Sequence, residues 1–302
     1  MIDDRAQAEH NARIGVAYGI AAYGAWGFAP VYFKAVADVP AMEVLGHRVI
    51  WSVLLLIILL VVRHRINEAM AALRDRRTLL TLCGTTLLIA VNWYLFIWAV
   101  AHEFVLQASL GYFVNPLVNV LLGYVFLRER LGRIQKISVG LASVGVGYMA
   151  IAVGTIPWIS LVLACSFGLY GLLRKTARVG PLVGLATETV ILLPAAIAYL
   201  AWLAIKGSGK FGTVSLSEDA LLAFAGVMTA VPLIWFANAA KRLRLSTLGF
   251  LQYLAPTGHF LLAVLAYGEP FTRVHVVTFA FIWTALAIYT VDATRFRKRY
   301  GQ

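Results

Sequence analysis

About ten stretches of roughly 20 apolar residues follow one another along this 302-residue chain, each long enough to cross the hydrocarbon core of a bilayer. Hydrophobic residues make up 61% of the chain and charged residues only 13%, which leaves no polar coat for a water-soluble fold. Backbone groups in lipid must be satisfied within their own segment, so these stretches are predicted to be helices. The sequence therefore predicts an all-α polytopic membrane protein with ten transmembrane helices. The predicted spans are Ile14–Phe33, Ala41–Val62, Thr78–Ala101, Val105–Leu127, Ile134–Gly154, Trp158–Leu173, Val183–Ile205, Ala220–Ala240, Leu245–Ala266 and Val274–Val291.

Positive charge is concentrated in alternate gaps between the spans and at the two ends. These places hold 21 of the 26 Lys and Arg residues. Basic loops stay in the cytoplasm, so both termini are predicted to be cytoplasmic. The net charge of +12 lies in loops that flank the membrane, which indicates membrane lipids as partners and argues against nucleic acid.

An internal repeat relates the two halves of the chain, residues 1–154 and 155–302. With Pro116 placed on Pro256, Glu129 falls on Glu269 and Phe96 falls on Phe236. Apolar segments also match at several positions by chance, so coincidence stays open as an alternative. If the halves share an ancestor, each has five helices, and an odd number inverts one half relative to the other. Inverted repeats that meet at a site in the middle of the membrane are typical of secondary transporters.

Glu188 is the one acidic residue that lies well within a predicted span. Ionisable groups at this depth are expensive and usually face the protein interior or a wet cavity. Glu188 could bind a proton or a substrate amine. Alternatively, it pairs with a neighbouring hydroxyl such as Thr187 or Thr189, or with cytoplasmic water.

A second polar group begins the second span. Glu43 and His47 are four residues apart on one helix face, and Arg48 follows directly. This group predicts either an outward-side gate or cavity wall, or an ion pair that anchors the second span to the first through Lys34. One His and one Glu are too few ligands for a metal site. His259 could titrate near neutral pH or could be a satisfied core histidine.

Polar residues recur beside Pro116 in the fourth span and beside Pro256 in the ninth. Each proline removes a backbone hydrogen bond and frees a carbonyl, which provides a hinge or, alternatively, a static kink. The polar residues that accompany the two prolines are Tyr112, Asn115 and Asn119 in the fourth span and Gln252 and Tyr253 in the ninth.

Aromatic residues in the spans belong either to interfacial belts and packing or to the apolar wall of a cavity. The sequence does not separate the two groups. Those considered for a cavity wall are Tyr23, Trp26, Trp93, Tyr94, Trp98, Tyr170 and Trp235.

Signatures of enzymes are missing from the sequence, which has no phosphate-binding loop, no His-Glu-x-x-His motif and no plausible Ser-His-Asp set. We predict a protein that is not an enzyme and needs no cofactor. Cys83 and Cys165 both fall within apolar runs and are expected to be buried thiols rather than a disulfide.

Several long motifs resemble one family. The motifs are GIAAYGAWGFAPVYFKAV from Gly19, NWYLFIWAV from Asn92, SLGYFVNPLVNVLLGYVFLRERL from Ser109 and, as a weaker match, LGFLQYLAPTGHFLLAVLAYGEP from Leu248. They resemble RarD-type proteins of the EamA family, in the drug/metabolite transporter superfamily. The resemblance implies a ten-helix exporter with two EamA repeats around a central cavity, located in a bacterial inner membrane.

From these observations we expect a secondary transporter that exports small amphipathic metabolites, above all amino acids, by alternating access. The coupling is open between proton exchange and facilitated diffusion. Three alternatives remain: a membrane-embedded enzyme acting on a lipid or lipid-linked substrate, an uptake system or facilitator for another small metabolite or drug, and an ion channel.

Overall fold

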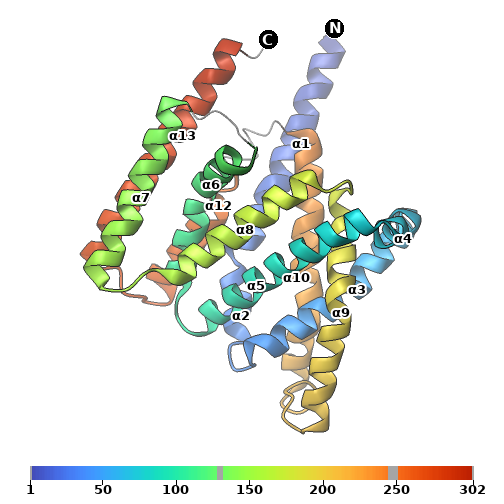
Figure 1. The fold of residues 1–302 in the computed structure, drawn as a ribbon. Coiled ribbons are helices and arrows are strands. Elements are labelled where there is room, and N and C mark those ends of the chain that lie inside the picture. The colour runs from blue at the N-terminus through green and yellow to red at the C-terminus, as the bar shows by residue number, and fades with distance from the viewer. Residues whose placement is uncertain (1, 128–131, 244–250, 301–302) are drawn as a thin grey trace.

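The computed structural model describes residues 2–127, 132–243 and 251–300, and within these ranges every regular element is a helix (Figure 1). This agrees with the predicted all-α membrane fold. Among the described residues, seven helical segments are long and apolar enough to cross a membrane, and three shorter apolar helices overlap the remaining predicted spans. The first part of the ninth predicted span, residues 245–250, lies outside the described residues. The helices are α1 (Ile2–Gly27), α2 (Ala29–Ala35), α3 (Ala41–Val62), α4 (Ile66–Arg74), α5 (Arg76–Ala101), α6 (Val105–Leu127), α7 (Arg133–Val153), α8 (Trp158–Thr176), α9 (Pro181–Ile205), α10 (Leu216–Arg242), α12 (Leu254–Leu261), the π-helix η1 (Leu262–Ala266) and α13 (Arg273–Tyr300).

The first predicted span consists of two helices, α1 and α2, which meet at Phe28. Pro30 lies in the first turn of α2 and has no N–H to donate to the carbonyl of Trp26, four residues earlier. The break therefore leaves one carbonyl oxygen of α1 free for a partner from another helix.

The second predicted gap contains the short helix α4, which the sequence reasoning did not predict. The next helix, α5, begins with a side-chain cap. Asp75 accepts hydrogen bonds from the Thr78 hydroxyl (2.5 Å) and the Thr78 backbone N–H (2.9 Å). Both bonds lower the pKa of the Asp75 carboxyl below its usual value, and the bond from the hydroxyl has the larger effect.

Contacts between helices of the two halves follow a matched pattern. Helix α1 packs against α10 and α12, and α8 packs against α5 and α6. Further pairs join the halves directly, among them α3 with α9 and with α10, α6 with α12, and α7 with α13. The α7–α13 pair stands at one edge of the molecule in Figure 1, beside the other helices.

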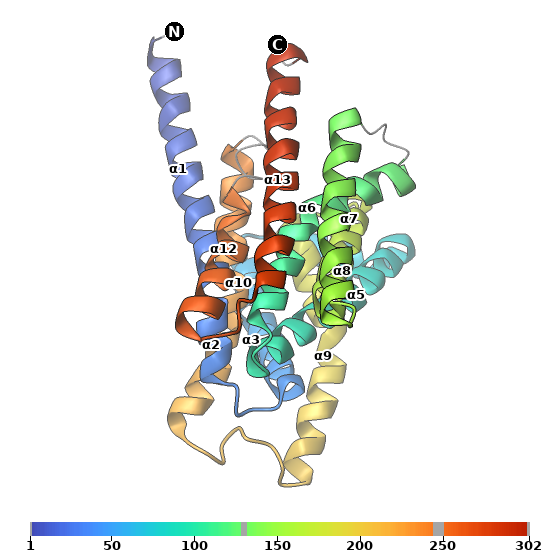
Figure 2. The same cartoon turned by 90° about the vertical axis from the view of Figure 1, so that its left-hand side faces the viewer.

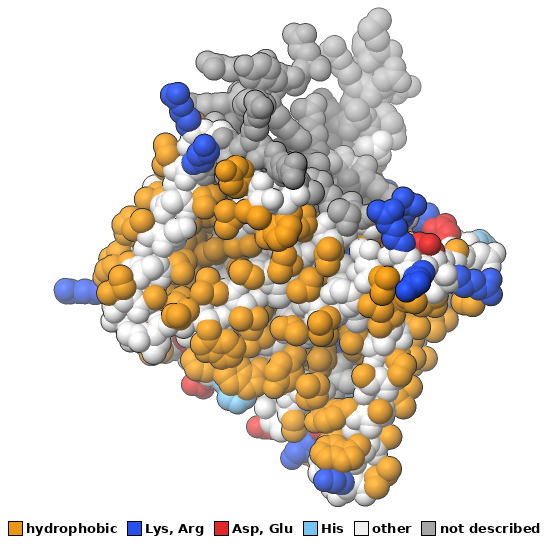
Figure 3. Space-filling model, viewed as in Figure 1, with side chains coloured by type: hydrophobic (Ala, Val, Ile, Leu, Met, Phe, Trp, Pro, Cys, Tyr) orange, Lys and Arg blue, Asp and Glu red, His pale blue; other side chains and the backbone are white. Residues whose placement is uncertain are grey.

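The N-terminal end of α1 and the C-terminal end of α13 lie at the same end of the molecule (Figures 1 and 2). The loop between α9 and α10 lies at the opposite end. Hydrophobic side chains are spread over the coloured part of the face shown in Figure 3, and Lys and Arg lie mainly near its margins.

The expectation that both cysteines are buried is wrong. Cys83 and Cys165 are free and exposed on the surfaces of α5 and α8. In a soluble protein an apolar run indicates a buried helix face, but a membrane helix can also present apolar side chains to lipid. Apolar sequence therefore does not by itself place a side chain inside the protein.

Candidate functional site

Polar side chains within the apolar helices form three groups. The first surrounds Glu188, the second surrounds Arg48 and His259, and the third joins Glu43 to the α9–α10 loop. Each group has different partners, so each has a different capacity for binding a solute.

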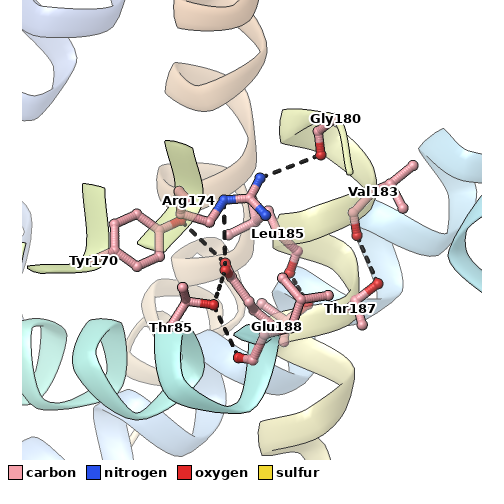
Figure 4. A network of polar contacts seen from close by, with 10 residues as sticks. Thr85, Tyr170, Arg174, Gly180, Val183, Leu185, Thr187 and Glu188 are labelled. Carbon is pink, nitrogen blue, oxygen red and sulfur yellow. Dashed lines mark hydrogen bonds and ion pairs between the residues drawn. The ribbon is translucent and has the colours of Figure 1, made fainter. Parts of the chain in front are cut away.

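Glu188 lies on α9 and is fully buried among side chains of α5 and α8 (Figure 4). Its carboxylate accepts hydrogen bonds from the Thr85 hydroxyl (2.7 Å) and the Tyr170 hydroxyl (3.2 Å). Arg174 of α8 completes an ion pair, with its Nε 3.8 Å from the carboxylate, and its terminal N–H donates to the Gly180 carbonyl. Thus Glu188 ties three helices together with every acceptor oxygen engaged.

The neighbours of Glu188 differ from those suggested by the sequence. The Thr187 and Thr189 hydroxyls donate to carbonyls of their own helix, at Val183 (2.8 Å) and Leu185 (3.0 Å). Neither hydroxyl contacts Glu188. Such bonds back to the preceding turn are a common outcome for Thr in a helix.

The polar stripe of α6 is largely occupied by contacts with α8. Asn115 donates to the Ala164 carbonyl (3.1 Å), and Asn119 donates to the Asn115 side-chain oxygen (3.0 Å). Tyr112 donates to the side chain of Asn92 (3.2 Å), which in turn bonds Ser166 (3.0 Å). These amides satisfy one another and hold α5, α6 and α8 in register.

Arg48 of α3 has a different environment. Its guanidinium carbon lies 4.1 Å from the centre of the Trp93 ring and 5.7 Å from that of Phe33. The Nε atom is buried and has no hydrogen-bond partner. Arg48 is therefore stacked on aromatic rings and leaves its N–H groups available.

His259 of α12 lies next to this aromatic region. Its ring centre is 5.1 Å from that of Phe96 and 5.7 Å from that of Tyr112. Its Nε2 is 2.9 Å from the Trp26 carbonyl, the oxygen that Pro30 leaves free in α1. Since a carbonyl only accepts, Nε2 carries the proton in the neutral ring and Nδ1 is an acceptor. Nδ1 is buried and has no partner.

We define the central cluster as Arg48, Phe33, Trp93, Phe96, Tyr112 and His259. Its members come from five helices, α2, α3, α5, α6 and α12. Ring contacts connect them continuously, because the Phe33 and Phe96 centres are 5.7 Å apart and those of Phe96 and Tyr112 are 5.8 Å apart. The cluster combines one cation, one unpartnered acceptor and an aromatic wall.

Other predicted site residues lie outside the central cluster. Tyr23 and Trp26 pack on each other and on Phe236, with ring centres 5.3 to 6.0 Å apart. Trp98 stacks on His102 at the end of α5, and Tyr253 stacks on Phe113. Three further side chains, half-buried, have no polar contact that connects them to the cluster: Tyr94, Trp235 and Gln252.

Pro116 and Pro256 occupy different positions within their helices. Pro116 lies inside α6, whereas Pro256 lies in the first turn of α12, where a missing N–H leaves no helical bond unmade. The Pro256 carbonyl accepts a hydrogen bond from the Ser109 hydroxyl (2.8 Å), which connects α12 to α6.

Glu43 and His47 hold the α9–α10 loop at the N-terminal end of α3. Glu43 accepts from the backbone N–H groups of Lys210 (2.6 Å) and Phe211 (3.3 Å). The Phe211 ring stacks on His47, with centres 4.7 Å apart. The expected anchor through Lys34 is wrong, because Lys34 pairs with Glu103 (3.5 Å).

Glu269 has a role that the sequence reasoning did not find. It follows η1 and accepts from the backbone N–H groups of Val105 and Leu106, each at 2.7 Å. These N–H groups belong to the first two residues of α6, and they would have no hydrogen-bond partner within the helix. Burial raises the pKa of the Glu269 carboxyl, and the two backbone hydrogen bonds lower it in part. Its counterpart in the repeat, Glu129, lies outside the described residues.

We predict that Glu269→Ala destabilises the protein by about 1–2 kcal/mol, as the loss of a helix cap does. Glu269→Gln keeps one acceptor oxygen and should cost less. An SDS titration of the purified protein measures both. Glu218→Ala provides a control, because Glu218 is a half-buried acidic residue in the first turn of α10 that caps no other helix among the described residues. Equal stability of the Glu269→Ala and Glu218→Ala variants would contradict the capping role.

A bundle of membrane-length apolar helices that holds polar groups in its interior defines the class of multi-pass membrane proteins. Residues 13–151 match the EamA-like transporter family. The chain belongs to the EamA family, in the drug/metabolite transporter superfamily, and is RarD-like. It is a multi-pass inner-membrane protein.

Relatives match nearly the full length of the chain. Protein RarD of Salmonella typhi is 48% identical over 93% of this chain and 96% of that protein. Protein RarD of Escherichia coli (strain K12) is 46% identical over 95% and 97%. An uncharacterized transporter of Vibrio cholerae is 46% identical over 95% of both chains. A solved crystal structure shares the fold, with a TM-score of 0.58 at 20% identity over 93% of this chain and 98% of that one.

Proposed function

We propose that this protein is a secondary transporter that exports small amphipathic metabolites, above all amino acids, by alternating access. The observation that carries this proposal is the set of buried polar atoms in and beside the central cluster that have no partner. These are Arg48 Nε, Ser52 Oγ, Thr86 Oγ1 and His259 Nδ1. A buried polar atom without a partner is costly, so a group of them indicates a place for water or a polar solute.

The location of these atoms supports passage through the protein. Ser52 is one helical turn from Arg48, and Thr86 is two turns from Trp93 on the same face of α5. Polar atoms therefore extend from the central cluster along α3 and α5. An amphipathic solute finds aromatic surface and hydrogen-bonding groups in the same region.

The contacts between helices support a mechanism with two moving halves. We propose that residues 1–154 and 155–302 form two inverted EamA repeats and that both termini are cytoplasmic. The matched contacts of α1 and α8, and the pairing of α3 with α9 and α6 with α12, are those expected of two related halves. The proposed flexible points are Pro116, inside α6, and the start of α12 at Pro256. The export direction rests on the family resemblance.

Transport is tested with purified protein in liposomes preloaded with labelled amino acids. We expect efflux above that of liposomes without protein, and saturation as the internal concentration rises. Unitary currents in planar bilayers would instead favour a channel, and conversion of a labelled lipid pool would favour an enzyme. The absence of flux for every amino acid tested would contradict the proposal.

A further inference from the structure

Arg48 carries a positive charge within a membrane-spanning helix, where a charged side chain is energetically costly. It lies seven residues into α3, which corresponds to a depth of about 10 Å along the helix. An Arg or Lys in a transmembrane helix needs compensation from a partner, a cavity or the interface. The compensation found for Arg48 therefore indicates what the residue does.

Acidic side chains do not provide that compensation. The ion pairs among the described residues involve Lys34, Arg65 and Arg174. Glu43 is the acid nearest to Arg48 in α3, and one of its oxygens is engaged by the α9–α10 loop. At five residues apart, the two side chains also point to different sides of the helix. The positive charge of Arg48 consequently has no counterion from the described part of the chain.

The contact that Arg48 does make leaves its binding edge free. The guanidinium lies over the face of Trp93, with 4.1 Å from its carbon to the ring centre. Stacking uses the flat face of the guanidinium, while the N–H groups project from its edge. That edge is the part of arginine that binds a carboxylate through two parallel hydrogen bonds.

We propose that Arg48 binds the carboxylate of the transported solute and that the site selects carboxylates over amines of the same shape. This inference rests on the proposed function and names the recognition element of the same site. One unpaired cation matches one negative charge. The rings of Phe33, Phe96 and Tyr112 favour a solute with an apolar or aromatic body.

His259 adds a preference for a hydrogen-bond donor on the solute. Its unpartnered Nδ1 accepts a hydrogen bond, so it favours a solute that carries an N–H donor. A carboxylate, an apolar body and an N–H donor together describe an apolar amino acid. A simple amine lacks the group that Arg48 recognises, and a phosphate dianion would leave a charge without a partner.

Three compounds with the same aromatic body and amine test the inference: phenylalanine, its isosteric amide, and 2-phenylethylamine, which lacks the carboxyl group. We expect phenylalanine to protect the detergent-purified protein against heat at concentrations about 10- to 100-fold lower than either of the others, the range of one charge-assisted hydrogen-bonded contact. Arg48→Gln should remove this difference. Arg48→Lys should restore part of it, because Lys keeps the charge but not the bidentate geometry.

Arg65→Gln is the matched control, since Arg65 is an exposed cation that pairs with Glu68. This variant should retain the full preference for phenylalanine. Size-exclusion profiles show whether the Arg48 variants remain folded. If both Arg48 variants unfold, wild-type protein still tests the inference, because equal protection by all three compounds would overturn it.

Binding and transport distinguish the inference from the proposed function. Protection by phenylalanine that depends on Arg48, without flux in liposomes, would support the inference and contradict the transport proposal. Flux that does not discriminate among the three compounds, or that is unchanged in Arg48→Gln, would overturn the inference alone. Equal, Arg48-dependent protection by inorganic phosphate or by an anionic lipid would also overturn it.

Discussion

Arg174→Met should destabilise the protein by about 3–5 kcal/mol, the usual consequence of removing one partner from a buried ion pair. Glu188 has no exposed surface and would keep only the Thr85 and Tyr170 hydroxyls as partners. Two neutral donors do not neutralise a buried carboxylate. An SDS titration of wild type and variant measures the loss.

The double variant Arg174→Met with Glu188→Gln separates the cost of an unpaired charge from the value of the pair. It should recover most of the lost stability, because replacing both charges of a buried pair is often neutral or stabilising. Lys206→Met provides a control, since Lys206 is an exposed cation that lies over Trp202. A double variant as unstable as Arg174→Met would show that the ion pair is not the source of the effect.

Gly184 offers an independent way to disturb the same pair. A Cβ at this position would overlap the Arg174 guanidinium. Gly184→Ala should therefore move Arg174 away from Glu188 without removing either charge. Because the end of a flexible side chain can shift, we expect a smaller loss than for Arg174→Met.

The fold could be predicted from the sequence because its main signals are local. Each apolar run is contiguous, and alternate gaps carry the basic residues, so the spans and their alternating direction follow without tertiary information. The break at Phe28 was predictable in principle from Pro30 alone, and it was missed because the hydropathy of the run continues across it.

The partners of the polar residues could not be predicted, because they come from distant segments. Thr85 and Glu188 are 103 residues apart, and Glu43 meets Lys210 at a separation of 167 residues. No spacing rule within a helix reports such pairs. The sequence also does not show which side of a helix faces lipid, as the exposed Cys83 illustrates.

The separate role of Arg48 could have been predicted from its position in the sequence. It is the one arginine within a predicted span rather than in a gap. Its position in the sequence groups it with Glu43 and His47, although consecutive residues of a helix point in different directions. The structure separates them, since Arg48 joins the central cluster while Glu43 and His47 hold the α9–α10 loop.

Gly226→Ala should cost about 3 kcal/mol, at the upper end of the range for overpacking a well-packed interface. A Cβ on Gly226 of α10 would lie 2.6 Å from the carbonyl carbon and oxygen of Trp51 in α3. These are backbone atoms, which cannot rotate away as a side chain can. The two helices would have to separate to accept the methyl group.

Gly24→Ala is the matched control for this prediction. Gly24 lies in α1, and a Cβ there would meet nothing within 4 Å, so the change should be neutral or stabilising by up to about 1 kcal/mol through helix propensity. SDS titration of both variants gives the comparison. Equal stabilities would contradict the close crossing of α3 and α10.

The same crossing connects stability to the proposed binding site. Helices in a membrane associate mainly through close packing, and small residues permit the closest approach. Trp51 is one turn from Arg48 on α3, so a shift of α3 away from α10 would also displace Arg48 from Trp93. Gly226→Ala should therefore weaken protection by phenylalanine in the part of the population that remains folded, whereas Gly24→Ala should leave it unchanged.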